Sequence, residues 1–555
     1  MKRLTLCFAF FVVIYGGCLA LLGQVARPSP PQTSWLWYIW LALGATSLSS
    51  IAVEFTFFAV WLWLKYTGFT ADSGVPRRLT ISDRAFLLQQ HPSVAMLMPA
   101  HNEASTPQDR EALAERICDV LLKTPPYCMF FLLVDSPESQ RDHELSVVRD
   151  VRRRLRAAGH EDYSHRLALE EHRDKPPVWR HKCGSILRWL QRHGSQYEFM
   201  FLFDADSSLP EENPNEPRTR DVVERMVVAM LRDRNLAMVQ AAMHIRDHQT
   251  PWGWVQAVNA QVGTAYYLRV FSYLYGRATP CYGHNCLLRV RDFARYARNT
   301  LRYTSHDHID ASDLAAAGRG CMISDAVLTL EEPEDSILMW LKREARWSRG
   351  NGQWIVYLCK KRGLPLAPIV FLSLGIAQYL WALVGGLFFV ATAAVLSDNS
   401  GLASHVGTAP AQVLTGLVAF ALFVPRCLAS PSYREFFGST AIGLILGPAI
   451  MLFQGLAFVL GAFGTRWIPR GSRTDLFSPR QMLRIASTFL PITVLGALLW
   501  YQVADNLQSG HFTLFLQIMI TALIVSPLTA VLVSWPWRRY RREPADASAA
   551  VLRPE

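Results

Sequence analysis

Apolar residues fall into two patterns along the chain, and each pattern occupies its own part of the sequence. Long apolar runs cover 4–22 and 35–64, and more follow after residue 366. A membrane-spanning helix needs about 20 mainly apolar residues, so these runs are typical of spans. Residues 67–362 instead alternate short apolar runs with charged stretches. The pattern predicts a soluble unit inserted between two groups of membrane helices.

The middle unit shows the alternation expected of an α/β sheet. Runs rich in β-branched and aromatic residues predict strands at Val94–Met98, Met129–Val134, Phe199–Phe203 and Ala237–Gln240. Apolar residues at helical spacing predict helices at Glu111–Lys123, Glu144–Ala158 and Thr219–Asp233. Strands alternating with helices imply a sheet rich in parallel pairs, which binds ligands at the carboxyl ends of its strands. Functional residues are therefore expected directly after the apolar runs.

The first run, 4–22, has the features of a signal peptide or of a membrane helix, and we favour the helix because no good small-residue cleavage site follows. The second span contains Glu54, an acid for which a partner inside the bundle is one explanation. Residues 1–66 are thus predicted to form two N-terminal membrane helices, followed by a cytoplasmic domain over 67–362.

Five apolar segments make up the predicted C-terminal membrane region, 363–536, and they cover 367–396, 409–423, 437–464, 485–503 and 512–535. If all five crossed the membrane, the loop 465–484 with its five arginines would lie outside, against the positive-inside tendency. Gly447-Pro448 interrupts the third segment, so we interpret 437–464 as interfacial or re-entrant. About six spans remain, with both termini and the basic tail 537–555 in the cytoplasm.

Composition narrows the possible partners. Hydrophobic residues make up 51% of the 555 residues and charged residues 18%, which is too apolar for an ordinary soluble protein. The formal net charge of +11 could suggest nucleic acid, but the basic residues concentrate beside the apolar segments and favour a membrane surface. The ten cysteines lack zinc-finger spacing, and Cys281 and Cys286 are interpreted as reduced thiols.

Two carboxylates follow the third predicted strand. Asp204 and Asp206 lie one residue apart, so an extended chain presents both on one face. Two hard oxygen ligands suit Mg²⁺ or Mn²⁺ that is also bound by substrate phosphates. A bare Asp-x-Asp is also typical of a strand end that enters a turn. The neighbouring motifs are what favour metal binding here.

Other polar residues follow apolar runs in the same way. They are Pro99, Asn102 and Glu103 after the first strand, Asp135 after the second, Lys182 in Lys-Cys-Gly, then Gly283-His284-Asn285, Ser305-His306-Asp307 and Arg346-Trp347. The last pair lies in an amphipathic, basic stretch over 334–360 that suits a helix along the membrane surface. Each motif alone has a structural alternative, such as a strand-end turn, a helix N-terminus or an interfacial anchor.

In their order, these motifs resemble those of the processive family 2 glycosyltransferases, which include cellulose, chitin and hyaluronan synthases. The similarity covers 93–354 by motif and is greatest to the glucosyltransferase H branch, which makes osmoregulated periplasmic glucans. Arg343 stands where most synthases carry Gln before x-x-Arg-Trp, and Ser305-His306 stands where they carry Thr-Glu. Both variants are more similar to the glucan branch. The long N-terminal extension of that branch is not present, so its protein partners are not carried over.

The resemblance implies an α/β domain of the GT-A fold and an inverting transfer of glucose from UDP-glucose to a glucan acceptor, with Mg²⁺ or Mn²⁺ as cofactor. Asp307 would be the general base, and Asp204 and Asp206 would hold the metal. Donor binding would fall to Pro99, Asn102, Glu103, Asp135, Lys182, Asp204 and Arg346. Acceptor binding would fall to Gly283, His284, Asn285 and Trp347. The loop around 467–475 corresponds to a gating loop.

The expected product is an exported β-glucan, with a β-1,2 backbone by the closest resemblance, made at a bacterial inner membrane. Two alternatives remain enzymes: a single-transfer glycosyltransferase acting on a membrane lipid, and a cellulose-like synthase. A third is a non-catalytic transporter or receptor, against which the four intact acids Asp135, Asp204, Asp206 and Asp307 argue. Nucleic acid is the least favoured partner.

Overall fold

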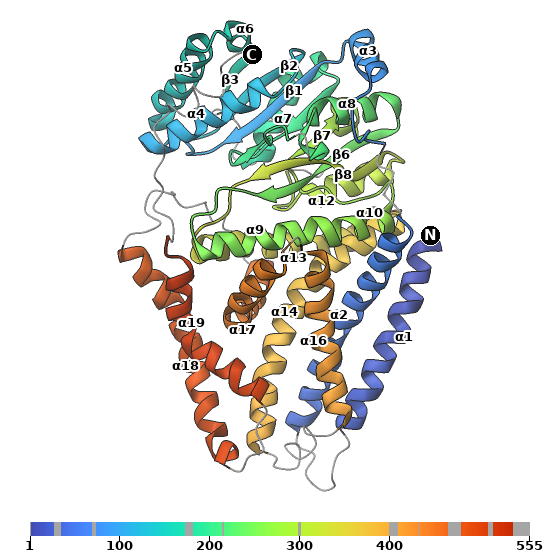
Figure 1. Ribbon diagram of the computed structural model, residues 1–555, viewed down its shortest axis with the longest axis vertical. Helices are drawn as coiled ribbons and strands as arrows, with labels where there is room; N and C mark the ends of the chain where they lie inside the picture. Colours follow the sequence, from blue (N-terminus) through green and yellow to red (C-terminus); the bar gives the residue numbers. More distant parts are fainter. Residues whose placement is uncertain are drawn as a thin grey trace.

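The chain folds as an α/β domain stacked on a set of long helices (Figure 1). This computed structural model describes residues 2–26, 35–68, 74–172, 181–213, 216–297, 301–398, 409–430, 432–463, 479–508 and 514–536. The predicted architecture, an α/β unit joined to a helical membrane bundle, is confirmed. The predicted gating loop around 467–475 and the basic tail 537–555 lie outside the described residues.

An eight-stranded mixed sheet forms the centre of the α/β domain, in the order β3-β2-β1-β4-β7-β6-β8-β5. Its strands are β1 (Val94–Ala100), β2 (Cys128–Val134), β3 (Leu167–Glu171), β4 (Phe199–Leu202), β5 (Ser207–Ser208), β6 (Leu236–Ile245), β7 (Cys286–Arg289) and β8 (Gly320–Glu331). Strands β1 to β4 pair in parallel, β6 pairs in parallel with β8, and β7 and β5 run antiparallel to their neighbours. The predicted strands and the parallel-rich sheet are confirmed, and four strands were not predicted.

Alternate residues of the central strands enter two different hydrophobic cores, because successive side chains of a strand point to opposite faces. Val94, Met96 and Met98 pack with helices α4 (Pro107–Leu122), α5 (Arg141–Ala157) and α8 (Val222–Arg232). Ala95 and Leu97 pack with α7 (His181–His193) and with α11 (Val290–Tyr296) and α12 (Asp307–Ala316). Burial on both faces explains why these strands read as continuous apolar runs. The polar residues are left to the strand ends.

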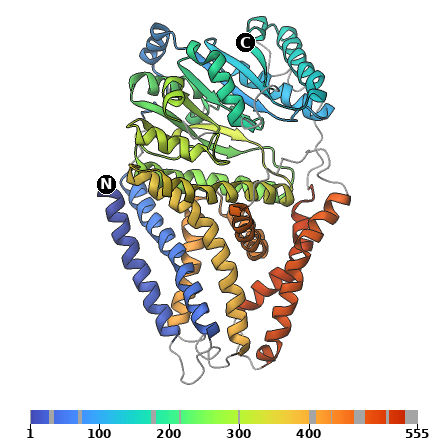
Figure 2. The ribbon, with the colours of Figure 1, turned by 180° about the vertical axis from the view of Figure 1, so that it is seen from behind.

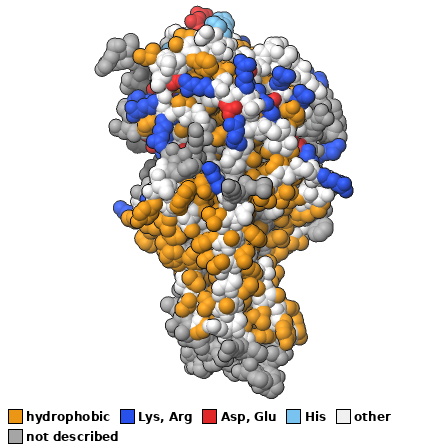
Figure 3. Space-filling model, turned by 90° about the vertical axis from the view of Figure 1, so that its right-hand side faces the viewer, with side chains coloured by type: hydrophobic (Ala, Val, Ile, Leu, Met, Phe, Trp, Pro, Cys, Tyr) orange, Lys and Arg blue, Asp and Glu red, His pale blue; other side chains and the backbone are white. Residues whose placement is uncertain are grey.

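Long apolar helices form the other part of the molecule. They are α1 (Lys2–Val25), α2 (Trp35–Tyr66), α14 (Leu366–Asp398), α16 (Ala409–Ala429), α17 (Tyr433–Phe463), α18 (Pro479–Gln508) and α19 (Leu514–Val533). Among the described residues, α1, α2, α14, α17 and α18 contain stretches long and apolar enough to cross a membrane, and α16 and α19 contain shorter apolar stretches. Figure 3 shows hydrophobic side chains over the surface of this part, and Lys and Arg gathered over the α/β domain.

Helix α17 differs from the sequence prediction. The prediction placed a break at Gly447-Pro448, but the helix is continuous from Tyr433 to Phe463 with Pro448 inside it. It is strongly foreshortened in Figures 1 and 2, where α14 of similar length is seen in profile, so the two axes cross steeply. Its placement relative to a membrane, and the count of six spans, stay predictions.

Three helices lie across the boundary between the two parts (Figures 1 and 2): α9 (Pro251–Gly263), α10 (Arg269–Tyr275) and α13 (Ile337–Lys360). Helix α13 is the amphipathic helix that the sequence predicts over 334–360. Thr250 caps α9 by accepting a hydrogen bond from the Gly253 amide at 3.0 Å. A π-helical turn, Thr264–Leu268, joins α9 to α10.

Buried Arg225 of α8 connects four segments of the α/β domain. Its side chain is 1% exposed. The guanidinium donates to the carbonyls of Pro76 and Pro217, both at 2.7 Å, of Arg220 at 3.0 Å, and of Ala326 on β8. The residue therefore supplies the donors that these carbonyls would otherwise find in water.

Replacing Arg225 with Met should destabilise the domain without emptying the space. Each carbonyl left buried without a donor costs about 1–3 kcal/mol, so we expect the free energy of unfolding to fall by at least about 3 kcal/mol. The measurement is the midpoint of thermal unfolding in detergent. Arg234→Met, at an exposed position just after the same helix, is the control and should leave the midpoint unchanged. Equal midpoints for both variants would contradict the role of Arg225.

Candidate active site

A cavity of about 1180 Å³ lies where the sheet, α13 and the helical bundle meet. From the predicted site residues it brings together Lys182, Asp204, Asp206, His284, Asp307, Arg346 and Trp347. From the bundle it adds Glu54 of α2, Gln378 and Tyr379 of α14, and Arg426 of α16. One cavity therefore joins the predicted catalytic carboxylates to helices that the sequence predicts as membrane spans.

Asp204 and Asp206 lie in the turn that leaves β4. The Asp204 amide donates to Ser207 Oγ at 3.1 Å, and the Ser207 amide donates to the Asp204 carbonyl at 2.9 Å. The two carboxylates therefore lie in a strand-end turn and also line the cavity. The turn holds them at the sheet edge. Lys182 Nζ of α7 forms an ion pair with Asp204 Oδ1. Burial opposes the charge of Lys182, but Asp204 and Asp307 outweigh it and raise the pKa of the ammonium group.

Asp307 is the first residue of α12, and its side chain is 25% exposed. A carboxylate is favoured at a helix N-terminus. Burial acts to raise the pKa of Asp307, but the positive charges of His306 and Lys182 outweigh it, and the pKa is lowered. Gly283 lies against this carboxylate with a φ of +82°, and a Cβ there would overlap the Asp307 side chain. Gly283 is needed both for its backbone conformation and for this close approach.

His284 follows Gly283 in the same loop and lies between two carboxylates. Its Nε2 contacts Glu331 Oε1, and its Nδ1 lies 3.8 Å from Asp204 Oδ2. Burial opposes a positive charge, yet Glu331 and Asp204 raise the pKa of His284 to about 10. Asn285 is fully buried behind it, donates to Glu331 Oε1 at 2.8 Å and is not among the cavity residues. Asn285 therefore has a supporting position.

Two residues that support this loop were missed in the sequence. Gln240 of β6 is fully buried; it accepts from the Tyr282 amide at 3.0 Å and donates to the His284 carbonyl at 2.9 Å. Glu331 ends β8 and lines the cavity. An isolated Gln inside an apolar run and an acid at a strand end are the signals that could have revealed them.

The residues predicted to hold the nucleotide gather beside this cavity rather than in it. Asp135 follows β2, and its Oδ1 lies 2.7 Å from His101 Nδ1. The Asn102 amide donates to Ser136 Oγ at 2.8 Å. Because β1 pairs in parallel with both β2 and β4, these residues share a sheet edge with Asp204. Pro99, Asn102, Glu103 and Asp135 are not among the cavity residues, and their donor role stays a prediction.

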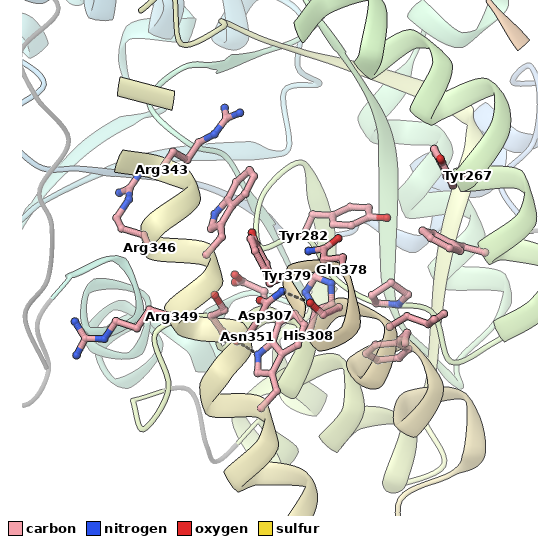
Figure 4. A pocket seen from close by; sticks show the side chains of 18 of the residues that line it. Tyr267, Tyr282, Asp307, His308, Arg343, Arg346, Arg349, Asn351, Gln378 and Tyr379 are labelled. Atoms are coloured by element: carbon pink, nitrogen blue, oxygen red, sulfur yellow. Dashed lines mark hydrogen bonds between the residues drawn. The ribbon is translucent and has the colours of Figure 1, made fainter. Parts of the chain in front are cut away.

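Helix α13 carries the Arg-Trp motif at the cavity. The Trp347 side chain is 45% exposed, and the guanidinium of Arg343 lies 4.7 Å from its ring centroid. Figure 4 shows Arg346 and Arg349 extending from α13 on the side away from Asp307 and His308. Trp347 and the arginines all line the cavity, and Arg346 and Arg349 do so on the side away from Asp307.

The same helix also fixes the loop that precedes Asp307. Trp354 Nε1 donates to the Ser305 carbonyl at 2.8 Å, and Gln353 Oε1 accepts from the Thr304 amide at 2.7 Å. Gly350 packs so closely on Ser305 that a Cβ there would overlap its hydroxyl. His308 stacks on Trp354 at 4.7 Å between ring centroids, and burial lowers the pKa of His308 to about 4. The part of the cavity wall formed by His308 and Trp354 is therefore neutral and aromatic.

On the bundle side, Glu54 has the partner that the sequence left open. Its Oε1 accepts from Tyr267 Oη at 2.7 Å, and Arg426 Nη2 lies 3.4 Å from the same oxygen and donates to Tyr267 Oη at 3.0 Å. All three residues line the cavity. Charged and hydroxyl groups thus line the cavity from the α/β domain to the bundle helices.

The structure can be compared with two further predictions, the metal site at Asp204 and Asp206 and the reduced thiols Cys281 and Cys286. Within the described part of the chain, no three His, Cys, Asp or Glu side chains form a group suited to a metal ion. Asp204 and Asp206 together match the one or two carboxylates that Mg²⁺ takes from a protein when phosphates supply further ligands. Cys281 and Cys286 are free thiols with sulfur atoms 3.8 Å apart, as the sequence predicts.

Comparison with known proteins gives one consistent set of relatives. No family model matches the chain. The chain is 23% identical over 541 residues to the glucans biosynthesis glucosyltransferase H of Xylella fastidiosa, covering 88% of this chain and 81% of that protein. It is 25% identical over 375 residues to the protein of the same name from Caulobacter vibrioides, covering 64% of this chain and about half, 52%, of that protein. The resemblance that the motifs predict is confirmed.

Among solved structures, a mannosyltransferase from Pyrobaculum calidifontis in complex with GDP-Man and Mn²⁺ is similar with a TM-score of 0.43 and 17% identity. The match covers 74% of this chain and 99% of that one.

Gly350→Ala tests whether α13 positions Asp307. The added methyl group must push Ser305 away, and a displacement of about 1 Å at a reacting group can cost about 100-fold in rate, so we expect a loss of sugar transfer of up to that size. Gly263→Ala is the matched control, because a Cβ at that helical glycine meets nothing within 4 Å. The measurement is initial transfer rate together with thermal unfolding. Equal rates for the two variants would contradict the role of α13.

Proposed function

We propose that this protein is a membrane-embedded inverting glucosyltransferase that uses UDP-glucose to build and export a β-glucan. The observation that carries the proposal is the shared cavity, which is lined by Asp204, Asp206 and Asp307 at one end and by bundle helices at the other. The relatives named glucosyltransferases for glucan biosynthesis support the sugar. The β-1,2 backbone rests on the same resemblance.

The proposed transfer is a single displacement at the anomeric carbon. An acceptor hydroxyl oxygen forms the new bond to this carbon while the bond to the diphosphate oxygen breaks, and UDP leaves with the electron pair. Asp307 accepts the hydroxyl proton. A base must be ionised to do so, and the lowered pKa of Asp307 keeps it ionised at neutral pH. Attack opposite the leaving group converts the α-linked donor into a β-linked product.

Lys182 and Arg346 would contact the diphosphate, and Asp135 with Asn102 would contact the uridine. Asp204 and Asp206 would hold Mg²⁺ or Mn²⁺, which supplies positive charge to the leaving diphosphate when bound. Trp347 would present its ring to the terminal acceptor sugar, beside His284.

The continuity of the cavity with the bundle helices supports the proposal of export. If each added sugar moves the chain by one unit, the polymer advances along the cavity toward Glu54, Tyr267 and Arg426. In this proposal the α/β domain and both termini are cytoplasmic, and the membrane is the inner membrane of a bacterium. Hydroxyl-rich glucan would exchange hydrogen bonds with these polar groups.

The first test is turnover of radiolabelled UDP-glucose by detergent-purified protein with Mg²⁺ or Mn²⁺, compared with Asp307→Asn. Removing a general base costs about 10²–10⁴-fold, so we expect polymer from the wild type and almost none from the variant. Asp162→Asn, at an exposed acid of the same domain, is the control and should keep the wild-type turnover. Linkage and size analysis then identify the glucan.

Other outcomes of this experiment would revise the proposal. Labelled lipid without polymer would favour the single-transfer enzyme, and a β-1,4 product would favour a cellulose-like synthase. Equal turnover by Asp307→Asn and wild type would exclude Asp307 as the base. Turnover with another UDP-sugar alone would correct the donor.

A second test separates export from synthesis. The double variant Glu54→Gln/Arg426→Gln removes both charges together, so neither is left unpaired. We expect delivery of glucan into the lumen of inside-out proteoliposomes to fall several-fold, whereas UDP release with a short acceptor stays within about twofold of wild type. Full delivery by the double variant would contradict a role for this end of the cavity in export.

A further inference from the structure

A buried imidazole lies directly behind the candidate base. His306 is 4% exposed, and its Nε2 lies 3.2 Å from Asp307 Oδ1. Its Nδ1 lies 2.7 Å from Asp310 Oδ2, and Asp310 is 3% exposed. The imidazole thus lies between two carboxylates, one in the cavity and one in the protein interior.

Helix geometry explains how the two outer groups reach the ring. The Asp310 amide donates to the His306 carbonyl at 2.8 Å, which closes the first turn of α12. Side chains four residues apart in a helix lie on the same face, so the Asp310 carboxylate reaches back to the imidazole. Because Trp354 holds the Ser305 carbonyl, the ring has little freedom to leave this position.

The surrounding charges favour the imidazolium form. Burial opposes the charge, but Asp307, followed by Cys183 of α7 and Asp310, outweighs it, so the pKa of His306 is well above its ordinary value. Lys182 and His284 also act on Asp307 from neighbouring elements. The Asp310–His306–Asp307 trio then carries one net negative charge.

We propose that His306 is a positioning residue for Asp307 and that Asp310 holds it in the charged state. The inference rests on the proposed function, in which Asp307 is the base. The imidazolium engages one oxygen of the Asp307 carboxylate and leaves the other to accept the hydroxyl proton. It also keeps Asp307 ionised although burial acts against its negative charge. His306, which stands where most synthases carry Glu in Thr-Glu-Asp, thereby has a physical role.

The kinetic test compares the pH dependence of kcat for His306→Gln and Asp310→Asn with that for Asp313→Asn, a matched loss of a buried acid from α12. Asp307 has a lowered folded pKa, so it is ionised throughout the range from about pH 5 to pH 9, and its ordinary value is about 3.9. In His306→Gln the positive charge is gone while burial remains, so the pKa of Asp307 rises and the acid limb moves to higher pH. At a pH below the pKa of Asp307 in both proteins, each unit by which the variant's pKa is higher lowers kcat about tenfold.

Asp310→Asn should show the opposite pH dependence. With one carboxylate removed, the pKa of His306 falls toward its ordinary value of about 6.5. Above that pH the ring is neutral and no longer holds Asp307 through charge, so the loss of kcat should grow from pH 6 to pH 8. KM for UDP-glucose should stay near the wild-type value in both variants. Asp313→Asn should keep the shape of the wild-type profile whatever its effect on stability. Profiles of the same shape in all three variants would overturn the proposal.

The charge state of His306 can be measured without any substrate. Failure of the further inference can therefore be distinguished from failure of the proposed function. Nitrogen-15 spectra of histidine-labelled full-length protein, with His306→Gln used for assignment, report whether both ring nitrogens carry protons. We expect both to be protonated at pH 8 in the wild type and only one in Asp310→Asn. A neutral His306 at pH 8 in the wild type would overturn the inference even if glucose transfer from UDP-glucose is observed. A protonated His306 in a protein that transfers no glucose from UDP-glucose would support the contact between His306 and Asp307 and would exclude UDP-glucose as the donor.

Discussion

Helix α13 belongs to both parts of the molecule, and the placement of the candidate base depends on that sharing. Toward the α/β domain, Trp354 binds the Ser305 carbonyl, and Tyr357 and Lys361 bind Asp313 of α12. Toward the bundle, Glu344 accepts from Tyr379 of α14 and Gln454 of α17. Buried polar groups must find partners, so both sets are satisfied together only in one register of the helix. A cavity continuous between the two parts is the consequence of that register.

Sequence pattern predicts the fold best where burial is complete. Strands β1, β2 and β4 are apolar on both faces, so their runs are visible without knowledge of the neighbours. Strand β3 ends in Glu170 and Glu171, which are paired with Arg192 and Arg141, and such pairs become visible only in the fold. Pro448 suggested a break because proline removes one backbone hydrogen bond. Helix α17 continues because neighbouring helices pack around it, which a single segment does not reveal.

The residues of the candidate site also fall into those that the sequence predicts and those that only the fold reveals. Acids that follow a strand are predictable, because parallel strands bring their carboxyl ends to one edge, and Asp204, Asp206 and Asp135 were found on that basis. Supporting residues were not, because their roles depend on contacts between distant segments. Gln240 serves the loop at 282–285, and Gly350 acts only through Ser305. Asp310 lies in the first turn of α12, where an acid is favoured anyway, and only its contact with His306 in the fold gives it a further role.

Three cations at the α/β end of the cavity, two partly buried and His306 fully buried, are each paired with a carboxylate: Lys182 with Asp204, His284 with Glu331, and His306 with Asp307 and Asp310. A buried charge is costly unless it is paired, so an anionic diphosphate can enter only if partners are exchanged. Lys182 is suited to that exchange, since moving from Asp204 to a phosphate leaves Asp204 able to bind a divalent cation beside Asp206. Donor without cation would leave Asp204 unpaired next to negative phosphate, and cation without donor would compete with Lys182 for the same carboxylate. In the proposed function, the Lys182–Asp204 pair therefore couples donor binding to cation binding and keeps both of these charges paired before either arrives.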